Sequence, residues 1–403
     1  MRVCILMAAV CLLAAPAPAD WIPLNSGTTT ELGAVCFPAD AVTGYAVGGG
    51  GLILKTTDCG ATWDSLPGDH PGQLTAVQFP MDAMTGYVAG SGGRIAKTTD
   101  GGATWVSESS GVTLDLRSIC FPVNTENGYV AGGNPGEGVV LKTTDGGANW
   151  AVLPVNPGQP IAAINFPIDD GMGFAAGWAG TLLRTADGGN TWDILSTGVA
   201  NDLNGISFPS DPLTGYLAAS AGLVIKTTDG GASWAPTWTG GSSFLASVSF
   251  LTPVAGYAVG ASGDVFKTTD GAETWLRQPS GTNEFLNSVQ FPVDDQTGYA
   301  VGRNGTIIKT IDGGGGVEET MNDERATMNV GATIVRGVLY LPPGSGVMHG
   351  ASRVLLDISG RTVLILHPGE NGVGHLASGV YFVSQASSVM RRASSVTKVL
   401  LTE

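Results

Sequence analysis

The string KTTDGGATW at residues 97–105 returns in varied form every 41 to 45 residues between Asp20 and Gly316. Each copy is centred on one aspartate of the series Asp58, Asp100, Asp145, Asp187, Asp229, Asp270 and Asp312. An Asp side chain can accept hydrogen bonds from backbone N–H groups one to three residues ahead, and glycine adopts positive φ where a chain reverses. Because aliphatic residues precede each Asp and a Trp usually follows it, the string predicts a hairpin turn between two strands.

One full repeat predicts four short antiparallel strands, at residues 74–80, 85–90, 94–98 and 104–107. Four strands in just over forty residues is the pattern of a β-propeller blade. In the third strand of every repeat, the residues four and five places before the Asp are both apolar. A strand that is apolar on both faces must be covered on both faces, as neighbouring blades do in a propeller. The chain therefore predicts an all-β fold with a seven-bladed β-propeller at residues 20–316.

The two ends of the repeat array predict how the ring closes. The last Asp turn, at Asp312, has no Trp after it, whereas the array opens with Trp21 and has no Asp turn before it. The opening segment, residues 21–28, matches the fourth-strand segment at residues 275–282. We expect residues 21–26 to supply the fourth strand of the seventh blade and so remove the exposed edges of an open array.

Three further segments flank the propeller. Residues 1–19 carry an early Arg, a short apolar run and a small-residue cleavage site, which predicts a secretory signal peptide and no transmembrane segment. Residues 317–332 are polar and predict a linker. Residues 333–403 contain short apolar runs that predict a small β-sandwich-like domain.

Residues 99–105 resemble the Asp-box of BNR-repeat propellers, and residues 20–316 look most like the seven-bladed photosystem II assembly and stability factor propellers. This resemblance implies that the Asp-box is a structural turn far from the ligand face. The segments 355–363, 376–383 and 397–401 are similar to the C-terminal sorting domain of type IX secretion. That second resemblance implies a Gram-negative cell, passage across the outer membrane with the secretion machinery engaging residues 333–403, and possible removal of the tail.

Charge and composition exclude several classes of partner and site. Between residues 20 and 317 there are 27 Asp and Glu against 11 Lys and Arg, which disfavours nucleic acid and anionic membranes. Of the cysteines outside the leader, Cys36, Cys59 and Cys120, no two form a CxxC pair, so neither a disulfide framework nor a zinc site is expected. His70 is the only propeller histidine, and the Asp turns lack the further acids of a calcium loop. We therefore expect no metal and no cofactor.

A BNR-type glycoside hydrolase is the catalytic alternative to a binding protein. A sialidase needs three arginines on the substrate carboxylate, a Tyr–Glu pair and an acid. The propeller has five arginines, of which Arg184 occupies the basic position of the repeat that Lys fills in the other six copies. We interpret these seven basic residues as structural, with the stem along the neighbouring blade and the charge near a turn carboxylate.

Residues that break the repeat are better candidates for function, because the fold does not require them. On the face that carries the second-to-third-strand and blade-to-blade loops, these are Asp69, His70, Arg117, Asn134, Glu137, Trp178, Asp202, Glu284, Arg303 and Asn304. The ordinary interpretation of each is a solvated loop residue. Trp178 and Arg303 stand out, because Trp and Arg are common anchors of binding surfaces.

The sequence favours a secreted or cell-surface, non-catalytic, monomeric propeller that binds an extracellular protein or glycan. Two alternatives remain: a periplasmic assembly factor for a membrane protein complex, and a degenerate glycoside hydrolase.

Overall fold

The computed structural model describes residues 21–66, 72–209, 212–241 and 244–314, together with the backbone of seven strands between residues 333 and 401. The chain divides into two compact units, Met1–Glu318 and Glu319–Glu403. The expected leader (1–19), the linker (317–332), Asp69 and His70 lie outside the described residues.

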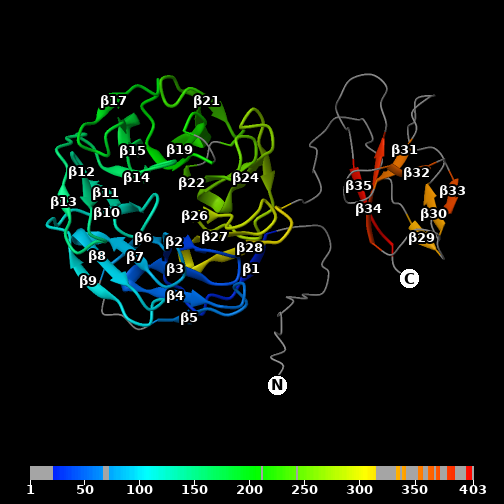
Figure 1. Ribbon diagram of the computed structural model, residues 1–403, viewed down its shortest axis with the longest axis horizontal. Coiled ribbons are helices and arrows are strands. Elements are labelled where there is room, and N and C mark those ends of the chain that lie inside the picture. Colours follow the sequence, from blue (N-terminus) through cyan, green and yellow to red (C-terminus); the bar gives the residue numbers. More distant parts are fainter. Residues whose placement is uncertain are drawn as a thin grey trace. The chain divides into compact units, whose positions relative to one another are not determined.

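The first unit is a seven-bladed β-propeller, and each blade is a four-stranded antiparallel sheet (Figure 1). Blade 1 consists of β2 (Leu32–Cys36), β3 (Gly44–Gly48), β4 (Ile53–Thr56) and β5 (Asp64–Ser65). Blade 2 consists of β6 (Leu74–Gln78), β7 (Gly86–Gly90), β8 (Arg94–Thr98) and β9 (Val106–Ser109). Blade 3 consists of β10 (Leu116–Cys120), β11 (Gly128–Asn134), β12 (Glu137–Thr143) and β13 (Ala151–Val152). Blade 4 consists of β14 (Ile161–Asn165), β15 (Gly173–Gly177), β16 (Leu182–Thr185) and β17 (Asp193–Leu195). Blade 5 consists of β18 (Leu203–Ser207), β19 (Gly215–Ala219), β20 (Leu223–Thr227) and β21 (Ala235–Trp238). Blade 6 is β22 (Leu245–Phe250), β23 (Gly256–Gly260), β24 (Val265–Thr268) and β25 (Leu276–Gln278), and blade 7 contains β26 (Leu286–Gln290), β27 (Gly298–Gly302) and β28 (Ile307–Thr310).

The fourth strand of blade 7 is β1 (Ile22–Leu24), which comes from the start of the propeller sequence. It pairs antiparallel with β28, so that Ile22 lies opposite Lys309 and Leu24 lies opposite Ile307. The predicted seven-bladed ring and its closure by the N-terminal strand are therefore confirmed.

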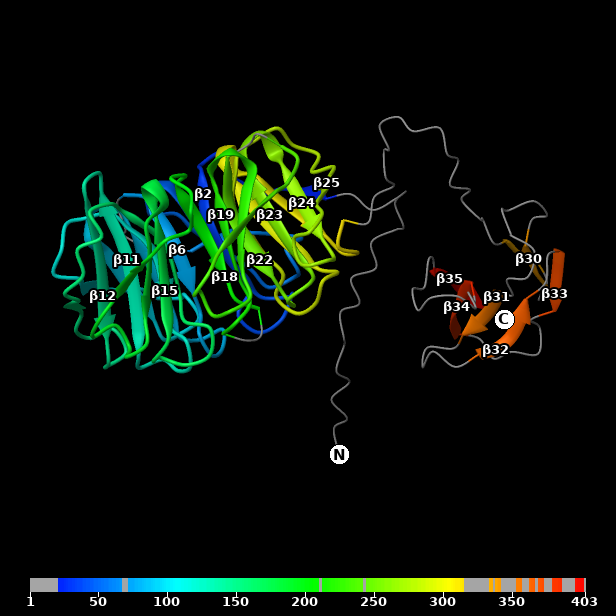
Figure 2. The same cartoon turned by 90° about the horizontal axis from the view of Figure 1, so that it is seen from above.

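Six of the seven turns between second and third strands contain a short 3-10 helix: η1 (Gly49–Gly51), η2 (Ser91–Gly93), η3 (Trp178–Gly180), η4 (Ser220–Gly222), η5 (Ala261–Gly263) and η6 (Arg303–Gly305). Blade 3 has a longer β11–β12 hairpin in place of this helix. The Asp turns join third and fourth strands, so they lie at the opposite end of the strands. We call the face with η1–η6 the loop face and the other the Asp-turn face. The edge-on view in Figure 2 shows strands running between the two faces. Among the described residues, no helix is long and apolar enough to cross a membrane.

Aromatic triads hold adjacent blades together near the Asp turns. Between blades 1 and 2, Tyr45 stacks on Phe79 with centroids 3.9 Å apart, and Trp105 meets Phe79 edge-on at 6.1 Å. The repeat explains this contact, because the Gly-aromatic pair, the Phe-Pro pair and the Asp-turn Trp supply one ring each. Trp21 takes the place of the missing Asp-turn Trp in blade 7, where it contacts Tyr257 and Phe291.

The Asp-turn carboxylates accept hydrogen bonds both within and beyond the expected range. Asp100 Oδ1 accepts hydrogen bonds from Thr98 Oγ1 (2.8 Å) and from the N–H of Thr104 (2.9 Å), and its Oδ2 accepts from Thr104 Oγ1 (2.6 Å). The N–H of Gly102, which lies between them, donates to Thr98 Oγ1 instead. At Asp312 the N–H of Gly314, two residues ahead, donates to Oδ1 at 3.1 Å, within the expected one to three.

The basic residue of the repeat contacts the Asp turn of the next blade. Lys97 Nζ donates to the carbonyl of Gly146 in that turn (2.8 Å) and lies 5.5 Å from the centroid of Tyr87. The same bond to the following blade is made by Lys55, Lys142, Lys226, Lys267 and Lys309. At the equivalent position, Lys226 Nζ also lies 3.9 Å from the carboxylate of Glu273 in the next Asp turn.

The second unit contains seven strands: β29 (Thr333–Val335), β30 (Val338–Leu341), β31 (Arg353–Leu356), β32 (Thr362–Leu366), β33 (Gly369–Gly372), β34 (Gly379–Gln385) and β35 (Val396–Leu401). They form a three-stranded sheet, β29-β30-β33, and a four-stranded sheet, β32-β31-β34-β35. The sandwich-like packing of this unit stays a prediction.

Candidate functional site

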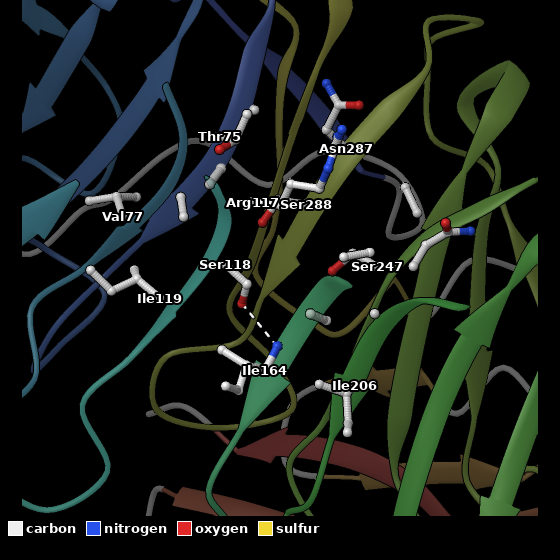
Figure 3. A pocket seen from close by; sticks show the side chains of 18 of the residues that line it. Thr75, Val77, Arg117, Ser118, Ile119, Ile164, Ile206, Ser247, Asn287 and Ser288 are labelled. Atoms are coloured by element: carbon white, nitrogen blue, oxygen red, sulfur yellow. Dashed lines mark hydrogen bonds between the residues drawn. The ribbon is translucent and has the colours of Figure 1, made fainter. Parts of the chain in front are cut away.

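The innermost strand of every blade lines a central channel, and each of these strands contains a bulge just after its first residue. The residue left unpaired by the bulge is Gly33, Thr75, Arg117, Ala162, Asn204, Ala246 or Asn287 in blades 1 to 7, and all seven line a cavity of about 230 Å³ (Figure 3). A bulge re-aims a side chain while leaving the strand intact. The fold therefore presents one freely variable side chain per blade to the channel.

Three of these bulge side chains link neighbouring blades. Asn204 Nδ2 and Asn287 Nδ2 each donate a hydrogen bond of 2.8 Å to the carbonyl of the leucine that begins the next blade. Thr75 Oγ1 makes the equivalent bond at 2.6 Å. One layer deeper, Ser118 Oγ accepts from the N–H of Ile164 at 3.2 Å, the bond drawn in Figure 3. These contacts hold the channel wall rigid.

Arg117 is the one charged side chain among the described residues that line this cavity. Its Nη2 donates to the carbonyl of Gly133 at 3.4 Å, a long bond, and its buried Nε has no hydrogen-bond partner. The net charge of the chain is −15, yet the charge at the channel is positive. An arginine with unused donors beside neutral hydroxyl and amide groups favours an acceptor-rich or anionic ligand.

Trp178 lies beside Arg117, although the two belong to different blades. The guanidinium carbon of Arg117 is 5.2 Å from the centroid of the Trp178 ring, within the range of a cation–π contact. The turn that carries Trp178 is held by Asp202, whose Oδ1 accepts from the N–H of Ala179 (2.9 Å) at positive φ. Thus three predicted site residues belong together, with Asp202 positioning Trp178 and Trp178 contacting Arg117.

A second cluster lies at the junction of blades 7 and 1. The guanidinium of Arg303 is 4.9 Å from the centroid of Phe285, and its Nε is 3.7 Å from Glu31 Oε1. Glu31 also accepts a hydrogen bond from Asn287 Nδ2 at 3.1 Å, and Phe285 meets Phe244 at 5.7 Å. This cluster connects an exposed arginine with the channel wall through Asn287.

The remaining predicted residues have simpler surroundings. Asn304 is exposed and supplies the positive φ of η6, and Glu284 is half-buried with its N–H bonded to Thr282 Oγ1. Asn134 and Glu137 are cross-strand partners at the tip of the β11–β12 hairpin. The structure gives none of these four a contact with the Arg117–Trp178 pair.

Sequence reasoning missed Thr75, Asn204 and Asn287. Their signal was available, because the position after the first-strand Leu or Ile varies between Gly, Ala, Thr, Asn and Arg, whereas the next position holds only Ala, Ser or Gly. An alignment of the seven repeats therefore identifies this position as one where the fold does not require a particular residue type.

The chemistry available at the channel is that of binding. One guanidinium, four hydroxyls and two amides line the cavity, and no carboxylate lines it among the described residues. Nor do the described residues bring together three or more His, Cys, Asp or Glu in a metal-binding group. Cys36 and Cys120 lie on the innermost strands of blades 1 and 3, and burial raises the pKa of each thiol to about 11.

A sequence profile described as photosynthesis system II assembly factor YCF48 matches residues 66–165 and 158–238, which is less than half of the chain. No curated protein matches the chain in sequence. Among solved structures, YCF48 bound to a D1 peptide is 19% identical with a TM-score of 0.60, covering 74% of this chain and 98% of that one. YCF48 from Cyanidioschyzon merolae is 20% identical with a TM-score of 0.60, covering 72% and 98%. The WD40 repeats of RRP9 are 14% identical with a TM-score of 0.63, covering 74% and 99%. At these identities the likeness to the solved structures shows the propeller fold.

Proposed function

We propose that the propeller is a non-catalytic binding protein that holds an extended segment of another protein at the channel mouth on its loop face. The observation that carries this proposal is the Arg117–Trp178 pair at the edge of the central cavity. A half-buried Trp beside a half-buried guanidinium offers one apolar contact and one anion contact to the same ligand. The ligand would carry an Asp, a Glu or a C-terminal carboxylate.

Two further points support a polypeptide ligand. The YCF48 structure with a D1 peptide is a propeller of the same fold that holds a peptide. The cluster of Phe244, Phe285 and Arg303 extends the loop face beyond the cavity and can contact a ligand longer than one side chain. An extended segment could therefore contact both clusters.

The test is selection of a random dodecapeptide library on the full chain, followed by titration of the selected peptides. Arg117→Gln and Trp178→Ala should each weaken binding about tenfold or more, which corresponds to about 1.4 kcal/mol or more. Arg94→Gln is the matched control, since Arg94 also has a buried Nε without a partner but does not line the channel cavity. Peptides that bind both variants as tightly as the unaltered protein would exclude this site.

The route to the place of action is part of the proposal. We infer export by the signal peptide at residues 1–19 and passage of the outer membrane through the type IX machinery, which would recognise residues 333–403. In support, the segments that resemble a sorting domain contribute β31, β34 and β35, which are adjacent strands of one sheet. Mass spectrometry of both termini, on protein from medium and cell fractions, tests this. A product that starts near Asp20 and ends between residues 316 and 333 is expected.

The second candidate is a periplasmic assembly factor for a membrane protein complex, favoured by the profile match over residues 66–238. It uses the same binding face but predicts a different location. Recovery only from the periplasm, with Glu403 intact, would favour it and count against the sorting tail.

A further inference from the structure

A second cavity, of about 500 Å³, lies at the edge of blade 6, and its lining includes Gly241, Ser262, Asp264, Phe266, Trp275 and Arg277. None of these residues lines the central channel cavity. Three of them, Gly241, Asp264 and Arg277, stand at positions whose residue type varies from repeat to repeat.

Two apolar side chains that fill other blade junctions are missing here. Val112 and Val139 pack into the apolar cluster between blades 2 and 3, and Val199 and Leu223 do so between blades 4 and 5. The corresponding residues between blades 5 and 6 are Gly241 and Asp264. A Cβ at Gly241 would lie 3.0 Å from Phe266 Cζ, so the Phe266 ring packs closely against the Gly241 backbone.

Asp264 and Arg277 form an ion pair on the wall of this cavity. Arg277 Nε and Nη2 lie 2.7 Å and 2.6 Å from Asp264 Oδ1. The Asp264 side chain is only 6% exposed, whereas that of Arg277 is 64% exposed. Burying a carboxylate costs free energy that its partner does not always return. Because blade 3 has Val139 and Val152 at these two positions, the blade does not require the pair.

The chemistry of this lining suits a sugar ring. The paired charges cancel, the guanidinium keeps an open side with donors, and Ser262 adds an exposed hydroxyl. The half-buried Trp275 supplies apolar ring surface, whereas Phe266 behind it is only 2% exposed. A pyranose offers hydroxyls that both donate and accept, together with an apolar C–H face. The volume lies within the range of about 300–1,000 Å³ that is typical of small-molecule sites.

We propose that this blade 6 cavity is a carbohydrate-binding site for a single pyranose unit of a glycan. Arg277 donates to adjacent sugar hydroxyls, Asp264 fixes the orientation of the guanidinium, and Trp275 contacts the sugar ring. This site is separate from the channel mouth, so that it can operate whether or not a polypeptide is bound there.

The probes are methyl glycosides of glucose, galactose, mannose and glucuronic acid, titrated into the full chain by saturation-transfer NMR. The double variant Asp264→Val/Arg277→Val gives blade 6 the residues that blade 3 has at these two positions. It should fold, since it replaces a buried ion pair by apolar side chains. Binding of the glycosides should fall at least about tenfold, or about 1.4 kcal/mol.

Two further variants test the site even if the double variant does not fold. Arg277→Lys keeps the charge but loses the planar donor geometry, so it should weaken binding severalfold. Arg94→Gln changes the residue that corresponds to Asp264 in blade 2 and should leave binding unchanged. Absence of binding for all four glycosides, or equal binding by Arg277→Lys and the unaltered protein, would overturn the site. Competition by the peptides selected on the channel mouth would also overturn it, because the two sites would then be one.

Discussion

The indole ring of Trp21 meets the ring of Phe291 edge-on, with centroids 5.8 Å apart, and thereby joins the start of the propeller to its last blade. Trp21 is 1% exposed and also contacts Tyr257. Its neighbour β1 completes the seventh sheet.

Replacing Trp21 should destabilise the closed ring. Truncation of a buried Trp to Ala costs about 3–5 kcal/mol, so Trp21→Ala should lower the denaturation midpoint in guanidinium markedly. Trp238→Ala is the control, since Trp238 is 62% exposed and should change the midpoint little. Equal effects of the two variants would contradict the role of Trp21 in closure.

Acid should loosen the Asp turns. Hydrogen bonds from the Thr104 side chain and backbone, with one from Thr98, lower the pKa of Asp100 to about 2 from an ordinary 3.8. A pKa lowered by folding contributes stability that is present above the unfolded pKa and is lost as the pH falls toward the folded one. The free energy of unfolding of the unaltered protein, measured in urea, should therefore fall between about pH 4 and pH 2.

The variant Asp100→Asn separates this turn from general acid effects. It should be less stable than the unaltered protein at neutral pH and should lose less stability on acidification. Asp64→Asn, on the exposed strand β5, is the control. A pH profile for Asp100→Asn parallel to that of the unaltered protein would exclude the proposed contribution.

Tyr87 and Lys97 should act as a coupled pair. Tyr87 Oη and Lys97 Nζ both donate to the carbonyl of Gly146, at 3.0 Å and 2.8 Å. Tyr87→Phe should cost about 0.5–1.5 kcal/mol, the usual worth of one hydrogen bond. A double-mutant cycle with Lys97→Met should show a coupling free energy of at least about 0.5 kcal/mol. Strict additivity would mean that the shared carbonyl does not connect the two side chains energetically.

Cys36 and Cys120 should resist alkylation in the folded protein. Burial raises the pKa of each thiol to about 11, so that almost no thiolate is present at neutral pH. Iodoacetamide labelling read by mass spectrometry should modify both only after denaturant is added. Labelling of either residue at the same rate in native and denatured protein would contradict the packing of the innermost strands.

The sequence predicts the blades well because every strand position recurs in phase. The paired apolar residues before each Asp, such as Ile95 and Ala96, are all buried as expected. The closing strand was predictable for the same reason, since the missing Trp after Asp312 is supplied by Trp21. Contacts between repeats were harder to predict. That Lys97 reaches Gly146 depends on the twist and spacing of adjacent sheets, which no single repeat encodes.

The candidate sites show the same limit. Arg117 and Trp178 were chosen separately as departures from the repeat, and only the ring geometry shows that they touch. Gly241, Asp264 and Arg277 are each unremarkable alone, because small or charged residues are common in loops and on edge strands. Their shared cavity appears only when the linker, β24 and β25 are brought together, so the blade 6 site could not be inferred from sequence.

The position of the seam in the ring has a mechanical consequence. Had the chain been cut between two blades, its first and last sheets would have been joined through side chains alone, and either could have peeled away. The cut instead falls inside blade 7, where β1 and β28 are fastened by main-chain hydrogen bonds. Tension applied to the two ends of the propeller would load this ladder first, so the circle should yield by unzipping one short strand while the other six sheets remain whole.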